Sequence, residues 1–242
     1  MAKRPTNSIS DQLKSSKVAL NNSNEDIEIK AELGKYGFDQ ARIAEGLTYY
    51  NEADAAVSAA AAALGDQKLA TENLEATKKR AEDAYQALSG VAKAVLKGNE
   101  GALTKLGLNR AMPRAMAPFI SAGNILFDNA LGDPDIKAKL AGRSYTDEKL
   151  TAEHAKIGDY DSADDKQEAA KGAYQRAAST EAAALKRLND WMSEFRNIAK
   201  IALKDNKNLL EKLGIKVRSV KTAAQRKAPA KAAATRAAKK KS

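Results

Sequence analysis

The sequence predicts an all-α protein: an elongated helical bundle of two tandem copies with long helices, followed by a disordered basic C-terminal tail. Two features of the composition favour helices. Ala accounts for 50 of the 242 residues, and aromatic residues make up only 5% of the chain. Ala, Leu, Lys, Arg and Glu are strong helix formers, whereas β-branched and aromatic residues suit strands. A third observation, an internal repeat, predicts how the helices are organised.

The repeat becomes visible when the sequence is aligned with itself so that position 17 falls on position 124, an offset of 107 positions. KVALNNSNEDIEIKAEL (17–33) then matches NILFDNALGDPDIKAKL (124–140), and VAKAVLKGNEGALTKLGL (91–108) matches IAKIALKDNKNLLEKLGI (198–215), without a gap. Ala richness alone would not align so many apolar and basic residues, so we interpret the match as a tandem duplication. The predicted divisions are a flexible N-terminus (1–9), helical repeat 1 (10–112), helical repeat 2 (117–219) packed with repeat 1 as one body, and a disordered basic tail (220–242).

Each copy is expected to begin with one helix. Apolar residues at 13, 18 and 20 in the first copy, and at 120, 125 and 127 in the second, suggest that helix. The run Asn21-Asn22-Ser23-Asn24 marks its end in the first copy, and Gly132-Asp133-Pro134 marks it in the second.

A short helix is expected next. Asp26 and Asp133 are its candidate N-caps, because an Asp side chain accepts hydrogen bonds from the free backbone N–H groups of a helix start. This helix is predicted to continue to Leu33 in the first copy and to Leu140 in the second. The residues predicted to close it are Gly34 and Gly37 in the first copy and Gly142 in the second.

A long helical stretch follows, with Asp39 and Thr146 as candidate caps, and continues to about Lys97 and Lys204. Its length depends on one Gly in each copy, because the chain either continues as one long helix or turns there into a helical hairpin. A lone Gly inside a helix costs only about 1 kcal/mol, and no turn signal follows it, so we favour the continuous helix. These glycines are Gly65 and Gly172. A final short helix is predicted over 209–214.

Few residues suited to catalysis or metal binding are present. The chain has no Cys and a single His, so thiolate chemistry is excluded and His-based sites are not expected. A di-iron bundle needs a Glu three residues before its His, but Thr151 precedes His154 at that spacing. The acidic segment DYDSADD (159–165) lacks EF-hand spacing, which favours a solvated helix face and leaves a weak divalent-cation patch as the alternative. We predict a protein that is not an enzyme and has no cofactor or metal.

Basic residues recur at matching positions of the two copies, where they form either an ordinary solvated helix face or two symmetry-related contacts for a polyanion. We favour the solvated face, in which Lys97 and Lys204 complement the negative C-terminal ends of their helices. The matching positions are Lys79-Arg80 with Lys186-Arg187, Lys93 with Lys200, and Lys97 with Lys204.

The net charge of +10 is concentrated near the C-terminus. Positions 218–242 hold nine basic side chains and no acidic ones, whereas the rest of the chain holds 32 basic and 31 acidic ones. This stretch has almost no large apolar residue with which to form a core, so it is expected to be disordered in isolation. Through KAPAKAAATRAAKKKS it resembles, in composition, the Ala/Lys/Pro-rich tails of linker histones and of some bacterial histone-like and granule-associated proteins.

These features predict a non-enzymatic structural or nucleoid-associated protein whose tail binds nucleic acid without sequence specificity. The alternative is a helical scaffold at a granule or envelope surface, whose body binds a protein or lipid partner or associates with itself; the tail then attaches to an anionic membrane or only aids solubility. The sequence contains no transmembrane segment or secretory signal, and we expect a cytoplasmic protein. The predicted nucleic-acid-binding residues are Arg218, Lys221, Arg226, Lys227, Lys231, Arg236, Lys239, Lys240 and Lys241.

Overall fold

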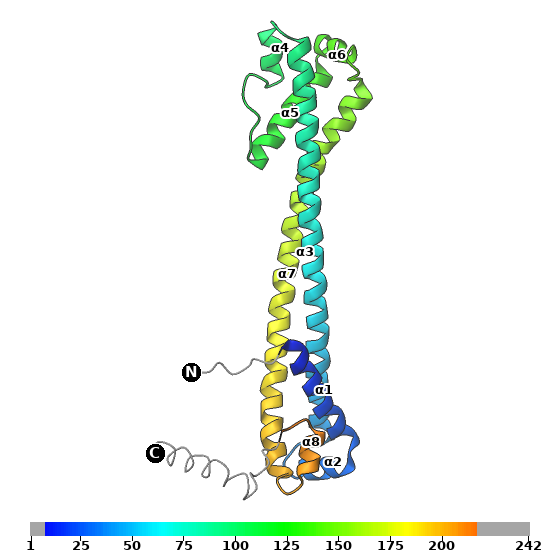
Figure 1. Cartoon of the computed structure of the whole chain (residues 1–242), viewed down its shortest axis with the longest axis vertical. Coiled ribbons are helices and arrows are strands. Elements are labelled where there is room, and N and C mark those ends of the chain that lie inside the picture. Colours follow the sequence, from blue (N-terminus) through cyan, green and yellow to red (C-terminus); the bar gives the residue numbers. More distant parts are fainter. Residues whose placement is uncertain (1–7, 217–242) are drawn as a thin grey trace, which may run out of the picture. The chain divides into compact units, whose positions relative to one another are not determined.

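A computed structural model describes residues 8–216, and in this part of the chain every regular element is an α-helix (Figure 1). The predicted all-α class is therefore confirmed. The helices of this part are α1 (Ile9–Glu25), α2 (Ile27–Gly34), α3 (Gln40–Val95), α4 (Glu100–Lys105), α5 (Met116–Gly132), α6 (Pro134–Ala141), α7 (Asp147–Ala202) and α8 (Lys207–Lys212).

The bounds of these helices follow the spacing of the sequence repeat. Each of α1 to α4 has a counterpart of the same length among α5 to α8, and the bounds of the counterpart are shifted along the chain by the offset of the repeat. The longest pair, α3 and α7, has 56 residues in each helix. This spacing agrees with the repeat seen in the sequence, whose origin by duplication stays an interpretation.

The two long helices are continuous. α3 passes through Gly65 and α7 passes through Gly172 without a break, which confirms the prediction of a continuous helix over a hairpin. The caps are also those predicted: Asp39 Oδ1 accepts a hydrogen bond from the Arg42 backbone N–H at 2.9 Å, and Thr146 Oγ1 accepts one from the Lys149 N–H at 3.4 Å.

The chain divides into two compact units, of which unit 1 combines residues 1–55 with residues 182–242. In its described part, α1, α2 and α8 gather around the N-terminal part of α3 and the C-terminal part of α7 (Figure 1). Its core contains an aromatic cluster in which Phe38 packs edge-on against Trp191 and Phe195, with ring centroids 5.5 and 5.6 Å away. Trp191 and Phe195 stack on each other at 5.4 Å.

Unit 2 consists of residues 56–181, in which α4, α5 and α6 gather around the C-terminal part of α3 and the N-terminal part of α7 (Figure 1). Its aromatic cluster uses other positions of the repeat: Phe119 lies 5.7 Å from Tyr85 and 6.1 Å from Tyr160 between ring centroids. Leu126 and Phe127 of α5 are fully buried in the same core. Both units therefore contain segments of both predicted repeats, and the repeat boundaries stay a prediction.

The short helices α2 and α6 begin as predicted. The Oδ1 atom of Asp26 accepts hydrogen bonds from the backbone N–H groups of Glu28 and Ile29 at 3.0 and 3.1 Å. Asp133 does the same for the N–H groups of Asp135 and Ile136 at 3.1 and 3.2 Å. Both sequence-predicted N-caps are confirmed.

One detail of the prediction is wrong. α1 does not end at Asn21–Asn24 but continues to Glu25. Within this helix the buried Ser23 hydroxyl donates to the Ala19 carbonyl 2.8 Å away. Gly142 is the C-cap of α6, as predicted, and has a φ of −62°. The left-handed residue of the turn that follows is Ser144, with φ +64°, at the position equivalent to Gly37 with φ +83°. Val18 and Ile125 of the apolar pattern are 39% and 44% exposed.

Candidate functional site

The sequence-predicted nucleic-acid-binding residues do not lie in the described part of the structure. All nine of them fall within 217–242, outside the described residues 8–216. Their role stays a prediction from the sequence. The candidate sites that the structure does describe lie on the helices of the two units.

The repeated spacing of basic pairs does not produce two equal cationic surfaces. Lys186 Nζ lies 2.5 Å from Asp190 Oδ2, and Arg187 Nη2 lies 3.1 Å from Glu52 Oε2, so an acidic side chain faces each of them. The first-copy pair, Lys79-Arg80, is exposed on α3. The difference favours the interpretation of an ordinary solvated helix face over two equivalent polyanion contacts.

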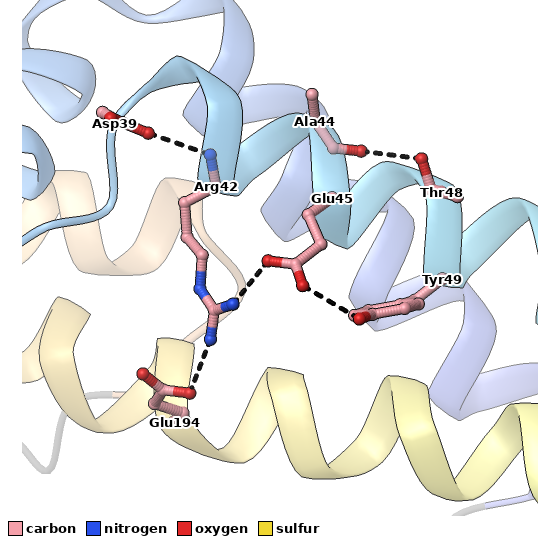
Figure 2. Close-up of polar contacts among 7 residues, drawn as sticks. All are labelled: Asp39, Arg42, Ala44, Glu45, Thr48, Tyr49 and Glu194. Atoms are coloured by element: carbon pink, nitrogen blue, oxygen red, sulfur yellow. Dashed lines mark hydrogen bonds and ion pairs between the residues drawn. The ribbon is translucent and has the colours of Figure 1, made fainter.

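A polar network joins α3 and α7 within unit 1 (Figure 2). The Arg42 guanidinium donates to the Glu45 carboxylate, and its other terminal nitrogen lies 2.9 Å from Glu194 Oε2. The Tyr49 hydroxyl donates to Glu45 Oε1 at 2.9 Å. The hydrogen bond from Tyr49 is the largest cause that lowers the pKa of Glu45, and it also raises the pKa of Tyr49.

The network is suited to holding two helices together. Arg42 and Glu45 are only partly exposed, and Arg42 contacts an acidic side chain on each helix. The buried indole N–H of Trp191 has no hydrogen-bond partner among the described residues. Because Glu45 is held as an ionised acceptor by Tyr49 and Arg42, we assign this cluster to positioning of α3 against α7.

A second candidate site is a groove of about 520 Å³ on unit 2, between α5 and the N-terminal part of α7. Apolar side chains of α5 form part of its wall, and Ile125 among them is 44% exposed. Three carboxylates line it, one from α5 and two from α7. The nine lining residues, here called the α5–α7 groove, are Met116, Ala117, Ile120, Ser121, Asn124, Ile125, Asp128, Asp161 and Asp164.

The only His of the chain lies beside this groove and connects its two walls. The Nε2 atom of His154, on α7, is 3.0 Å from Oδ1 of Asn124, and its Nδ1 atom is 3.7 Å from Oδ1 of Asp128. Its ring stacks on Phe127 with centroids 5.5 Å apart. His154 is partly buried, and its neighbours hold the ring against α5.

The charge of the α5–α7 groove is one-sided. Asp128, Asp161 and Asp164 are acidic, and none of the other six lining residues is basic. Asp161 and Asp164 form no ion pair with any side chain in residues 8–216. Within the same residues, no group of three His, Asp or Glu side chains is placed to hold a metal ion. The arrangement is suited to a cationic ligand that brings an apolar surface of its own.

The sequence analysis singled out residues from only one of the two helices that line this groove. The acidic segment 159–165 was recognised, and it supplies Asp161 and Asp164. The α5 wall was missed because Asn124 and Asp128 are single polar residues in an apolar helix. Their spacing of four residues, about one helical turn, is the signal that could have placed them on one face.

The comparisons with known proteins add no assignment. No protein-family model, curated protein or solved structure matches the chain. No helix formed by residues 8–216 is long and apolar enough to cross a membrane.

Proposed function

We propose that this chain is a non-enzymatic nucleic-acid-binding protein in which residues 217–242 supply the phosphate contacts and the helices carry them. The observation that supports the proposal is the distribution of charge. Of the 41 basic residues, nine lie in 217–242 and two in 1–7, so residues 8–216 hold 30 basic against 31 acidic side chains. The chain therefore combines a nearly neutral helical body with one strongly cationic segment.

Such a segment is expected to bind the phosphate backbone of nucleic acid as a polycation. Lys and Arg side chains that neutralise phosphates release condensed counterions, so binding weakens steeply as salt is added. Phosphate contacts position a protein without reading sequence, because base edges must be reached within a groove. We therefore propose binding that does not depend on base sequence, in the cytoplasm, where nucleic acid is accessible.

The proposal is tested with two full-length variants that lose the same number of positive charges. In the tail variant, six basic residues are replaced with Gln: Arg226, Lys227, Lys231, Lys239, Lys240 and Lys241. In the body variant, six exposed basic residues of the long helices and the turns after them are replaced with Gln: Lys79, Arg80, Lys93, Lys97, Lys200 and Lys204.

The expected result is a large loss of affinity for duplex DNA in the tail variant and a small loss in the body variant. Fluorescence anisotropy at low ionic strength measures both. Equal losses in the two variants would contradict a dedicated role of the tail. A loss confined to the body variant would favour the contacts by the paired basic positions of the long helices.

A second candidate function, a scaffold whose body binds a protein or lipid partner, is supported by an exposed apolar side chain in unit 1. Ile27, at the start of α2, is 83% exposed beside a groove of about 490 Å³ that Ala31, Leu203 and Leu209 also line. The test is co-sedimentation of the tail variant with phosphatidylglycerol vesicles. Binding that persists in the tail variant and is lost on Ile27→Gln supports the scaffold, whereas no binding removes its lipid form.

A further inference from the structure

The α5–α7 groove has the composition of a binding surface for a basic segment. Met116, Ile120 and Ile125 give it an apolar wall, and its three carboxylates give it a charge of −3 without a basic residue in the lining. α5 contains no Lys or Arg along its 17 residues, and neither does α7 between Lys156 and Lys166. Asp161 and Asp164 form no ion pair with any side chain of residues 8–216.

The positions equivalent to the groove in the first copy provide an internal comparison. In the alignment of the two copies, the polar residues Ser121 and Asn124 of the groove are replaced with the basic residues Lys14 and Lys17. Two of its carboxylates are also missing from the first copy, where Asp128 corresponds to Asn21 and Asp164 to Val57. The nine equivalent positions therefore carry two basic residues and one acidic residue, Asp54. The strong negative charge belongs to the second copy alone and is not a general property of the repeated helix pair.

We infer that the occupant of the α5–α7 groove is the basic segment 217–242 of this chain. The segment matches the groove in charge, because it has nine basic residues and no acidic ones. It also matches in size of side chains, since its Ala residues are small enough to lie against Met116, Ile120 and Ile125. No other stretch of the chain has this charge.

The contact is electrostatic and therefore reversible. The three carboxylates are at the protein surface, where an added salt concentration near 1 M shortens the screening length to about 3 Å. A polyanion competes with the groove for the same Lys and Arg side chains. The docked segment is thus held on unit 2 until a stronger anionic ligand removes it. This inference goes beyond the proposed function, because it concerns the protein without nucleic acid.

Paramagnetic relaxation measured by NMR tests the contact in the full chain. The natural chain has no Cys, so Ser162→Cys places a single spin label on an exposed position of α7 between the two carboxylates of that helix. The expected result is a loss of resonance intensity for residues in 217–242 when the label is oxidised, and recovery of that intensity at high salt. Tail resonances that are the same with oxidised and reduced label would overturn the inference.

A matched pair of charge variants, both carrying the label, distinguishes binding of the tail in the groove from general electrostatic attraction to the acidic surface. The groove variant is Asp128→Asn, Asp161→Asn and Asp164→Asn, and it is expected to remove the effect of the label on the tail. The control variant is Asp66→Asn, Glu72→Gln and Glu75→Gln, which removes three exposed carboxylates from α3 in the same unit, and it is expected to retain the effect. An effect that survives in the groove variant would also overturn the inference.

A mixture of isotope-labelled chain without the spin label and spin-labelled chain without isotopes identifies the molecule that supplies the segment. Loss of tail intensity in the mixture assigns the contact to a neighbouring copy. Loss only when both labels are in one chain assigns it to the same molecule. Neither experiment contains DNA, so its failure is distinct from a failure of the proposed nucleic-acid binding.

Discussion

The ammonium group of Lys105, on α4, lies 2.8 Å from Oδ2 of Asp133, which also caps the start of α6. The equivalent pair of the repeat does the same, with Lys212 Nζ of α8 2.9 Å from Oδ2 of Asp26. One pair lies in unit 2 and the other in unit 1. In each pair, the basic residue comes from one half of the chain and the acidic residue from the other.

A backbone contact beside each pair repeats the relationship. Asn129 Nδ2 donates to the Lys105 carbonyl at 2.8 Å, and Asn22 Nδ2 donates to the Lys212 carbonyl at 2.5 Å. Reciprocal contacts of this kind, in which residue i meets j and j meets i, define an isologous interface between identical subunits. Their presence within one chain supports the interpretation that the two halves arose by duplication.

The two ion pairs predict how stability depends on pH in acid. The hydrogen bond from the Lys ammonium is the largest cause that lowers the pKa of Asp26 and of Asp133 below the usual 3.8. A carboxyl whose pKa is lower in the folded state contributes stability above its unfolded pKa, and this contribution is lost as the pH falls through the folded pKa. Urea unfolding of the Asp26→Asn, Asp133→Asn double variant should therefore show a weaker loss of stability below about pH 4 than the natural chain shows.

Asn retains most of the capping ability of Asp, so this substitution isolates the charge. The control is Asp66→Asn with Asp159→Asn, two exposed residues outside any ion pair of the described part, and it should keep the acid dependence of the natural chain. If the Asp26 and Asp133 variant loses stability in acid as steeply as the control does, the assigned role of these pairs is wrong.

Two glycines inside α3 should respond to Ala in opposite directions. A Cβ on Gly46 would lie 2.5 Å from Cη2 of Trp191 and 2.8 Å from Cδ2 of Leu20, whereas nothing lies within 4 Å of a Cβ on Gly65. Overpacking costs about 1–3 kcal/mol. Replacing Gly by Ala in a helix otherwise gains up to about 1 kcal/mol. Gly46→Ala should therefore lower the free energy of unfolding, and Gly65→Ala should raise it.

Chemical denaturation followed by circular dichroism measures both changes. Trp191→Leu is the companion substitution, because a smaller side chain at that position relieves the clash and should reduce the penalty of Gly46→Ala. A Gly46→Ala chain as stable as the natural protein would show that Trp191 and Leu20 do not enclose that position.

The turns after α2 and α6 have one equivalent position that is Gly in the first copy and Ser in the second, so the two residues can be exchanged. Ser144 has φ +64° and its counterpart Gly37 has φ +83°, in the left-handed region that costs a residue with a side chain about 1–2 kcal/mol. Ser144→Gly should therefore raise the melting temperature, and Gly37→Ser should lower it. Ser162→Gly, within α7, is the control that should lower stability because Gly disfavours a helix interior. A Ser144→Gly chain of reduced stability would contradict this account of the turn.

Local structure was largely predictable from the sequence because its causes are local. The N-caps Asp26, Asp39, Asp133 and Thr146 act on backbone groups two or three residues away, and the long helices have no Pro or turn signal to stop them. The misplaced end of α1 shows the limit of that reasoning. The run of Asn residues signals a turn, but Asn22 instead donates to the carbonyl of Lys212, a residue 190 positions away.

Packing and the groove were less predictable because they depend on which segments meet in space. The exposure of Val18 and Ile125 follows from the faces that α1 and α5 turn to solvent, which an apolar pattern alone does not specify. In the same way, Asp128 joins Asp161 and Asp164 only because α5 lies along α7. Periodicity assigns residues to one face of a helix, but it does not identify the neighbouring helix.

The most direct test of the proposed function is the salt dependence of duplex DNA binding by the natural chain and by the six-residue tail variant. Each phosphate contact contributes about −0.9 to the slope of log K against log salt concentration. Nine contacts would give the natural chain a slope of up to about −8, and loss of six should reduce its magnitude by about 5. The same slope in both proteins would show that the C-terminal segment does not contact the phosphates, and the account of this chain as a cationic-tail nucleic-acid binder would be wrong.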